Sequence, residues 1–188
     1  MIVVVSQTQD LRKYACEDTL RDGRAILIRS IRSTDKLALL NGFHRLSKQS
    51  IHSRFFGGKH DLTVEELKYY TEVDFQTHVA LVAEVKSDSK PLGVGRFFIN
   101  KVIEPLTADI AITVDETSHG LGVGTILFKH LIAIARQLGI ELLSAEILAS
   151  NTSMIHIIEK LKFPVKKKQI GDYLTVKILI NQQNSTPQ

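Results

Sequence analysis

The stretch His119-Gly-Leu-Gly-Val-Gly-Thr125 decides the fold, because it sets three glycines at alternate positions between a strand-like run and the most regular helical pattern of the chain. Glycine has no Cβ, so the backbone can adopt positive φ angles here and approach a ligand closely. Successive N–H groups then point into one concavity at a helix N-terminus, where the helix dipole also favours negative charge. The turn therefore predicts a cradle for a phosphate or pyrophosphate group.

Two common nucleotide motifs do not fit this turn. A dinucleotide fingerprint requires the spacing GxGxxG, and Thr125 stands where its third glycine would be. A P-loop requires Gly-Lys-Ser/Thr, and no lysine follows these glycines. The turn therefore binds another kind of phosphate-bearing ligand, or it only joins a strand to a helix.

The segments around the turn predict the fold class. The helix at 122–138 carries Leu127, Leu131 and Ile134 on one apolar stripe, and Gly139 ends it. Apolar runs predict strands at 25–31, 78–85, 92–99, 108–114, 141–148, 165–170 and 173–180. Further helices are expected at 36–44, 49–56, 64–71 and 152–161, the third opened by a Thr63–Glu66 capping box and the last capped by Asn151 or Thr152. This order predicts an α/β fold with a mixed central sheet, antiparallel in its N-terminal part and flanked by helices.

Length and composition indicate one domain. The 188 residues are 44% apolar, enough for one substantial core, which we expect over residues 25–180 with no room for a fused regulatory domain. Residues 1–24 are expected to form a loose lead-in or to pack on the edge of the domain, and residues 181–188 to form a flexible tail. The apolar run at 2–5 is too short for a signal peptide or a membrane span, and the single cysteine, Cys16, allows no internal disulfide. A cytoplasmic protein is therefore expected.

Charge and histidine spacing restrict the partners. The net charge of +4 suits an anionic ligand or an acidic surface. Nucleic acid is disfavoured, because no aromatic residues alternate with the basic run Lys166-Lys167-Lys168, which we expect to be a solvated strand edge. The seven histidines lack metal-binding spacing, and no base can be assigned to a nucleophilic Cys16.

At the glycine turn the sequence resembles the GNAT superfamily of acetyltransferases, whose cofactor signature is Gln/Arg-x-x-Gly-x-Gly/Ala at the start of a central helix. Gly122 and Gly124 match the two signature glycines, whereas His119 and Leu121 replace residues that are commonly polar or basic. The stretch 145–163 resembles the family's next strand and helix. A tyrosine that serves as general acid in many relatives is replaced there by Ile158.

The resemblance implies that acetyl-CoA is the cosubstrate and that the turn binds its pyrophosphate through the backbone. It also implies that the strand before the turn contacts the pantetheine arm and the thioester, where a backbone N–H can stabilise the developing oxyanion. The residues expected to contact the cofactor are Ile112, Thr113, Val114, His119, Gly120, Leu121, Gly122, Val123, Gly124, Thr125 and Asn151.

The segments at 26–36, 53–74 and 78–85 narrow the resemblance to the acetyltransferase domains of bacterial Pat-type protein-lysine acetyltransferases, over about residues 19–180. That branch carries a glutamate as its base in the strand before the turn, and Asp109 occupies the matching position. A base helps because an amine such as that of lysine is mostly protonated at pH 7. The apolar neighbours of Asp109 predict partial desolvation, which would raise its pKa.

Other residues remain candidates for the base. Glu72, Asp74 and His78 are expected near the substrate side, Glu146 lies on the next strand, and water alone is a further possibility. Arg54, in contrast, is expected to pack and to form a surface ion pair.

The sequence thus predicts an acetyl-CoA-dependent N-acetyltransferase that acts by direct attack of a primary amine, either of a small molecule or of a protein lysine. A non-catalytic acetyl-CoA-binding module that senses or docks is the alternative, favoured by His119, Leu121 and Ile158. The closing strands could pair between subunits, so a homodimer is possible.

Overall fold

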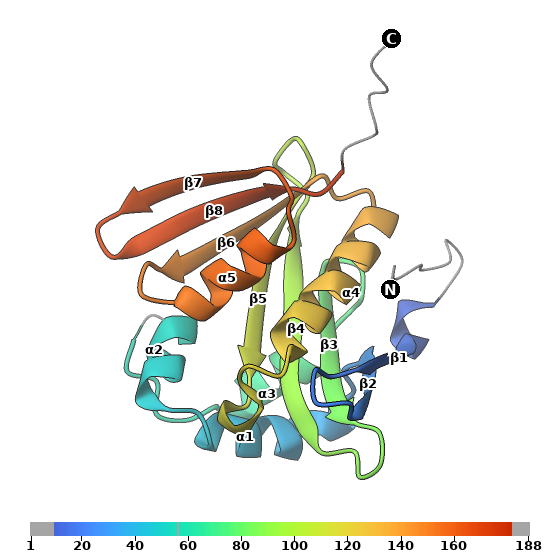
Figure 1. Cartoon of the computed structure of the whole chain (residues 1–188). Coiled ribbons are helices and arrows are strands. Elements are labelled where there is room, and N and C mark those ends of the chain that lie inside the picture. Colours follow the sequence, from blue (N-terminus) through green and yellow to red (C-terminus); the bar gives the residue numbers. More distant parts are fainter. Residues whose placement is uncertain (1–9, 56, 182–188) are drawn as a thin grey trace.

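The computed structural model describes residues 10–55 and 57–181, and it forms one eight-stranded sheet with helices on both faces (Figure 1). The strand order is β1-β2-β3-β4-β5-β6-β8-β7. The strands are β1 (Ala15–Thr19), β2 (Ala25–Ser30), β3 (His78–Val85), β4 (Pro91–Asn100), β5 (Thr107–Val114), β6 (Leu142–Leu148), β7 (Val165–Ile170) and β8 (Tyr173–Leu179). The helices are α1 (Lys36–His44), α2 (Lys48–Phe55), α3 (Val64–Thr71), α4 (Val123–Gln137) and α5 (Thr152–Lys160).

The expected fold class is confirmed. Strands β1 to β5 pair antiparallel in sequence order, β5 and β6 pair in parallel, and β6, β8 and β7 pair antiparallel again. The parallel pair is possible because α4 carries the chain from the end of β5 back to the start of β6. The crossover therefore places the glycine turn directly at the end of β5.

The segment before residue 25 adds a strand that the sequence did not predict. In β1, Ala15 lies opposite Arg29 and Thr19 opposite Ala25. The residues of β1 alternate between exposed and half-buried, so they show no apolar period. Of the two expectations for this segment, packing on the edge of the domain is the one observed for its described part. Residues 1–9 and 182–188, which include most of the expected tail, lie outside the described residues.

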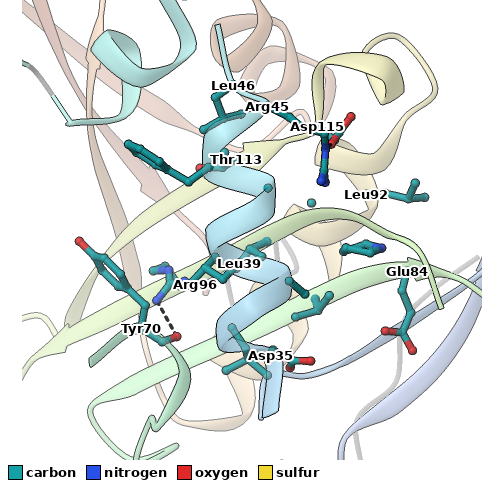
Figure 2. A pocket seen from close by; sticks show the side chains of 18 of the residues that line it. Asp35, Leu39, Arg45, Leu46, Tyr70, Glu84, Leu92, Arg96, Thr113 and Asp115 are labelled. Atoms are coloured by element: carbon teal, nitrogen blue, oxygen red, sulfur yellow. Dashed lines mark hydrogen bonds and ion pairs between the residues drawn. The ribbon is translucent and has the colours of Figure 1, made fainter. Parts of the chain in front are cut away.

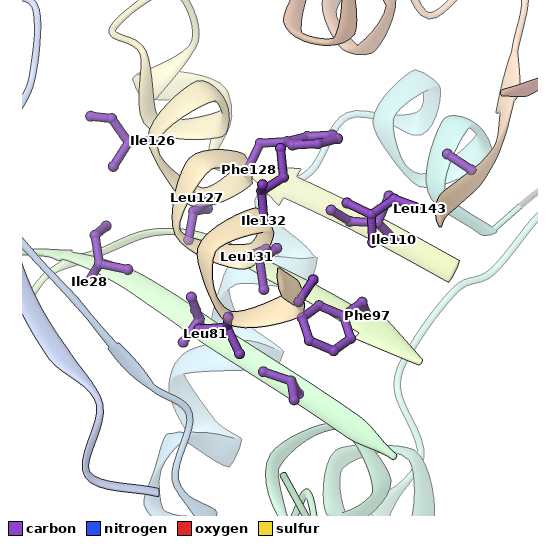
Figure 3. Packing of buried hydrophobic residues seen from close by; sticks show 14 of the residues in the cluster. Ile28, Leu81, Phe97, Ile110, Ile126, Leu127, Phe128, Leu131, Ile132 and Leu143 are labelled. Carbon is purple, nitrogen blue, oxygen red and sulfur yellow. The ribbon is translucent and has the colours of Figure 1, made fainter. Parts of the chain in front are cut away.

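Helix α4 and one face of the sheet form the main core (Figure 3). Leu127, Leu131 and Ile134 are fully buried, as the predicted apolar stripe requires. A Cβ on Gly95 of β4 would lie 2.8 Å from the Leu131 Cδ1 atom, so this glycine allows the close approach of α4 to the sheet. Gly139 ends the helix with a φ of +76°.

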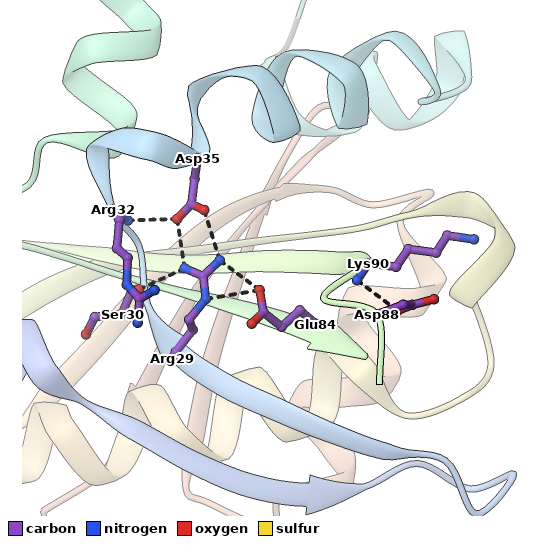
Figure 4. Close-up of polar contacts among 7 residues, drawn as sticks. All are labelled: Arg29, Ser30, Arg32, Asp35, Glu84, Asp88 and Lys90. Carbon is purple, nitrogen blue, oxygen red and sulfur yellow. Dashed lines mark hydrogen bonds and ion pairs between the residues drawn. The ribbon is translucent and has the colours of Figure 1, made fainter. Parts of the chain in front are cut away.

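The opposite face of the sheet is held to α1 by a buried ion-pair cluster (Figure 4). The Arg29 guanidinium donates to the Asp35 carboxylate at 2.8 and 2.9 Å and to the Glu84 carboxylate at 2.7 and 3.0 Å. Asp35 directly precedes α1, while Arg29 and Glu84 lie on the neighbouring strands β2 and β3. The cluster therefore fixes the start of α1 relative to the sheet.

Helix α3 begins with the expected capping box. The Thr63 hydroxyl accepts a hydrogen bond from the Glu66 N–H at 3.2 Å, and the Glu66 carboxylate accepts one from the Thr63 N–H at 2.9 Å. These bonds satisfy N–H groups that have no partner within the helix. The helix brings Tyr69 and Tyr70 to the same face of the sheet as α1.

Candidate active site

Strands β5 and β6 separate part-way along their length. Asp109 and Ser144 form the last pair in their parallel register, although β5 continues to Val114 and β6 to Leu148. Beyond this point β5 remains paired with β4 and β6 with β8, so the two halves of the sheet diverge (Figure 1). A cleft therefore opens between the two strands from Ile110 towards the glycine turn, and Asp109 and Ser144 lie next to its lining without being part of it.

The cleft has a volume of about 450 Å³. It is lined by the exposed side of β5, the glycine turn, the first residues of α4 and the start of α5, with α2 at its border. Leu121 is not part of this lining, because its side chain packs against the core. The expected cofactor residues that do line the cleft are Ile112, Thr113, Val114, His119, Gly120, Gly122, Val123, Gly124, Thr125 and Asn151.

The glycine turn has the geometry of an anion cradle. Gly120 and Gly122 have φ angles of +77° and +97°, which L-amino acids with a side chain rarely adopt. Gly122 is the N-cap of α4, and the first N–H groups of a helix have no acceptor within it. A Cβ on Gly124 would lie 2.8 Å from the Ile157 Cδ1 atom, so this glycine lets α4 approach α5.

Two side chains border the cradle. The His119 Nε2–H donates to the Val114 carbonyl at 3.2 Å, and its Nδ1 lies 3.6 Å from the Glu116 carboxylate. Asn151 caps α5, since its side-chain oxygen accepts a hydrogen bond from the Met154 N–H at 3.1 Å. Both side chains thus have a structural role besides lining the cleft.

Sequence reasoning missed Arg21, which lies in the turn between β1 and β2 and also lines the cleft. The Arg21 guanidinium donates to the Gly120 carbonyl at 2.9 Å, and the Arg21 backbone N–H donates to the Leu121 carbonyl at 3.1 Å. It thus brings to the cradle a positive charge that Leu121 lacks. Because 99 residues separate Arg21 from Gly120, no local pattern could have indicated this contact.

Asp109 lies where the two strands separate. The Ser144 hydroxyl donates a hydrogen bond to its carboxylate. On the other side its neighbour across the sheet is Phe98, whose ring stacks on Tyr69 at 5.9 Å between centroids. The Asp109 side chain is exposed, so the expected partial desolvation is wrong for this structure. Its neighbours Ala108 and Ile110 point into the core beneath α4, so Asp109 lies on the opposite face of the sheet, next to the point where β6 leaves β5.

Two alternative candidates for the base are engaged elsewhere. The Glu72 carboxylate pairs with the Lys36 ammonium group. The Asp74 carboxylate accepts hydrogen bonds from the Thr77 hydroxyl and from the backbone N–H groups of residues 76–78. Burial acts to raise the pKa of Asp74, but these hydrogen bonds outweigh it and lower the pKa. Both residues have structural roles, whereas Glu146 does line the cleft.

The third alternative, His78, is buried and uncharged at neutral pH. Burial, and secondly the charge of Arg96, lowers its pKa to about 4. Its Nε2 lies 3.2 Å from a guanidinium nitrogen of Arg96. Because Arg96 can only donate, the neutral Nε2 is the acceptor and the proton is on Nδ1.

A second cavity, of about 290 Å³, lies between the sheet and the helices α1 to α3 (Figure 2). Helix α1 passes along it, from Asp35 at one end to Arg45 and Leu46 at the other. This cavity shares Arg54, Ala111 and Thr113 with the cleft. A molecule in this second cavity would therefore meet a cofactor that lies along β5.

The contacts of Arg54 differ from the packing and surface ion pair that the sequence predicted. Its side chain is half-buried, with the guanidinium 5.3 Å from the centroid of the Phe55 ring. Within residues 10–55 and 57–181 no carboxylate lies within 4.0 Å of it, so the expected surface ion pair is not formed there.

Within the described residues, no group of three or more His, Cys, Asp or Glu side chains is arranged to hold a metal ion. In the same part of the chain, no helix has both the length and the apolar character needed to span a membrane.

Comparison with known proteins agrees with the geometry. Residues 48–163 match the family model described as the acetyltransferase (GNAT) family. The acetyltransferase PA5475 of Pseudomonas aeruginosa is 31% identical over 137 residues, which cover 73% of this chain and 74% of that protein.

Proteins named Pat are also similar. The acetyltransferase Pat of Mycolicibacterium smegmatis is 26% identical over 156 residues, which cover 83% of this chain but only 46% of Pat. The crystal structure of the GNAT domain of S. lividans PAT superposes with a TM-score of 0.80 and 25% identity, covering 88% of this chain and 96% of that domain. The resemblance noted in the sequence is therefore confirmed.

Proposed function

Because this chain belongs to the acetyltransferase (GNAT) family and is an N-acetyltransferase with acetyl-CoA as its cosubstrate, we propose that it acetylates a primary amine with Asp109 as the general base. The amine is that of a small molecule or of a protein lysine. We also propose that the lining residues of the cleft, with Arg21, bind acetyl-CoA.

The separation of β5 from β6 is the observation that carries this proposal. The glycine cradle lies at one end of the cleft, and residue 110 of its lining directly follows Asp109, which forms with Ser144 the last pair between the two strands. A pyrophosphate in the cradle would direct the pantetheine arm along β5 towards Asp109. Past the last pair β5 and β6 no longer pair within the described residues, and we propose that backbone groups on this edge of β5 bind that arm and the thioester carbonyl.

The proposed reaction is one displacement. The neutral amine nitrogen attacks the thioester carbonyl carbon, and its proton passes to the Asp109 carboxylate directly or through a water molecule. The Ser144 hydroxyl holds that carboxylate in place. The carbon–sulfur bond then breaks, and the coenzyme A thiolate takes a proton from water, since Ile158 at the usual tyrosine position carries none.

The test compares Asp109→Asn with Glu146→Gln, because Glu146 is an acidic residue of β6 that lines the cleft. Acetyl transfer to a panel of amines is followed by mass spectrometry, and acetyl-CoA binding by calorimetry. We expect Asp109→Asn to lower kcat by about 10²–10⁴-fold, with acetyl-CoA affinity within twofold of wild type. Glu146→Gln should change kcat only a few-fold. The reverse pattern would assign the base to Glu146, and full activity of both variants would leave water as the base.

A further inference from the structure

Four arginines line the cavity beneath α1, and they differ in their partners. The Arg29 charge is compensated by the carboxylates of Asp35 and Glu84. The Arg45 guanidinium lies 2.8 Å from the buried carboxylate of Asp115. Arg54 and Arg96 have no such compensation within the described part of the chain.

Arg96 is the more deeply buried of the uncompensated pair, with a residue exposure of 5%. Its guanidinium donates to the Tyr70 carbonyl at 3.2 Å, lies 3.2 Å from the neutral His78 ring nitrogen, and is 4.6 Å from the centroid of the Tyr70 ring (Figure 2). All these partners are uncharged. They satisfy some of its N–H groups, but they leave a full positive charge inside the protein.

Arg54 adds a second positive charge to the lining of the same cavity. Burial, and secondly the charge of Arg54, lowers the pKa of Arg96 to about 9. Burial also lowers the pKa of Arg54. Buried charges are normally paired, because their desolvation is costly. A bound anion between these two guanidinium groups would offset both the desolvation and their mutual repulsion.

The position of this charge pair relates it to the reaction. Arg96 on β4 lies opposite Ala111 on β5, and Ala111 is two residues from Asp109. Two residues along a strand span about 7 Å, and neighbouring strands are about 5 Å apart. The Cα atoms of Arg96 and Asp109 are thus about 9 Å apart, a separation that one small molecule in contact with both side chains can span.

The remainder of the cavity is mainly apolar, and its volume of about 290 Å³ is at the small end of the range for ligand sites. Its apolar lining includes Leu39, Phe43, Leu46, Leu62 and Val94. The cavity is therefore suited to a small molecule with an apolar group, and not to an extended peptide.

We propose that the acceptor is a free amino acid with an apolar side chain, whose carboxylate binds Arg54 and Arg96. Guanidinium groups bind carboxylates through paired hydrogen bonds, and two of them can hold both oxygens. The α-amine then faces Asp109, and the side chain occupies the apolar part of the cavity. A protein lysine would bring no anion to these arginines. This inference rests on the proposed function and specifies its substrate class.

The test compares L-leucine with L-leucinamide, which keeps the amine and the side chain but lacks the carboxylate. In wild type we expect kcat/KM to be at least 100-fold higher for leucine, even though the less basic amine of the amide is more often neutral. Arg54→Met should lower kcat/KM for leucine by about 100-fold, mainly through KM. It should lower kcat/KM for leucinamide only a few-fold, and because Arg54 also lines the cleft, any change in the KM of acetyl-CoA should be the same with both acceptors. Lys48→Met, which removes an exposed charge from the same helix α2, is the matched control and should behave as wild type.

Each contrary outcome has a distinct meaning. Equal rates for the acid and the amide in wild type, or an equal loss for both in Arg54→Met, would overturn the carboxylate site while leaving amine acetylation intact. Acetylation of lysine peptides but not of either leucine compound would do the same. Acetylation of no amine at all would overturn the proposed function itself. If Arg54→Met does not fold, as judged by circular dichroism, two other measurements test the carboxylate site. They are the ratio of kcat/KM for leucine to kcat/KM for leucinamide in wild type, and the same ratio in Arg54→Lys.

Discussion

At the scale of single residues, Arg21 contributes to the proposed cofactor site from a distant part of the chain. The family signature commonly places basic side chains within the glycine turn, and this turn has His119 and Leu121 instead. Arg21, in the β1–β2 turn, instead contacts the Gly120 and Leu121 carbonyl groups of the glycine turn. The positive charge at the cradle is thus present, although it comes from outside the signature.

We therefore predict that Arg21→Gln weakens acetyl-CoA binding. A hydrogen bond to a charged group contributes about 1.5–3 kcal/mol, so the Kd should rise roughly 10- to 100-fold in calorimetric titrations. Arg24→Gln is the control, because Arg24 lies on the same turn but pairs with Asp22. An unchanged Kd for Arg21→Gln would mean that this arginine only supports the loop.

A second residue-scale prediction concerns His78 and pH. Its pKa is about 4 in the folded protein and about 6.5 in the unfolded chain, so between these values only the unfolded chain binds the proton. When the pH is lowered from 7.5 to 5, His78 alone should therefore reduce the free energy of unfolding by about 2 kcal/mol. Burial also lowers the pKa of His130, which adds a loss in the same direction.

Urea unfolding at the two pH values tests this prediction. His78→Gln keeps an acceptor for Arg96 but cannot be protonated, so it should reduce the difference in stability between the two pH values. His60→Gln is the control, since His60 is exposed and should not affect that difference. An unchanged difference in His78→Gln would show that His78 is protonated equally in both states.

The sequence predicted the local features of the site and missed the long-range ones. The positive φ angles of the glycine turn and the N-cap role of Asn151 depend on neighbouring residues, so both could be read from the pattern. The exposure of Asp109 and the pairing of Arg21 with Gly120 depend on how distant strands meet. Among the described residues, the lack of a carboxylate near Arg54 and Arg96 likewise depends on which distant elements the fold brings together.

At the scale of elements, every predicted helix and strand is present, and their boundaries agree to within one or two residues. Strand β1 was missed because neither of its faces is fully buried, so its sequence has no alternating apolar pattern. Strand β7 shows the expected solvated edge, with Lys166, Lys167 and Lys168 all exposed. Like charges there oppose pairing with a second copy, and the homodimer remains a prediction.

The capping box gives a prediction at this scale. Thr63→Ala removes the hydroxyl that accepts the Glu66 N–H and should lower the free energy of unfolding by about 1 kcal/mol. Because α3 supplies the Tyr70 carbonyl that holds Arg96, KM for the acceptor should also rise. Urea unfolding and steady-state kinetics measure the two effects. Lys68→Ala, on the exposed side of the same helix, should change stability by less than about 0.5 kcal/mol.

At the scale of the whole molecule, the two cavities allow both substrates to be bound at once. The cleft that we propose to bind acetyl-CoA and the cavity beneath α1 meet at Arg54, Ala111 and Thr113. The single cysteine lies on β1, outside both linings. This arrangement favours direct transfer between two bound substrates over an acetylated enzyme intermediate.

Initial-rate kinetics should therefore give intersecting lines when acetyl-CoA and the acceptor are both varied. Mass spectrometry after incubation with acetyl-CoA alone should find no acetylated cysteine, and Cys16→Ser should retain wild-type kcat. Parallel lines together with loss of activity in Cys16→Ser would instead indicate a covalent intermediate.

The contact between Arg21 and the glycine turn couples the hairpin formed by β1 and β2 to the proposed cofactor site. Strand β1 lies at the edge of the sheet, where backbone amides open readily by local fluctuation. If the bound cosubstrate holds Arg21, it must also favour the closed state of the hairpin, since such coupling is reciprocal. Hydrogen exchange in β1 should then slow on addition of acetyl-CoA, and anything that frees the hairpin would promote release of the coenzyme.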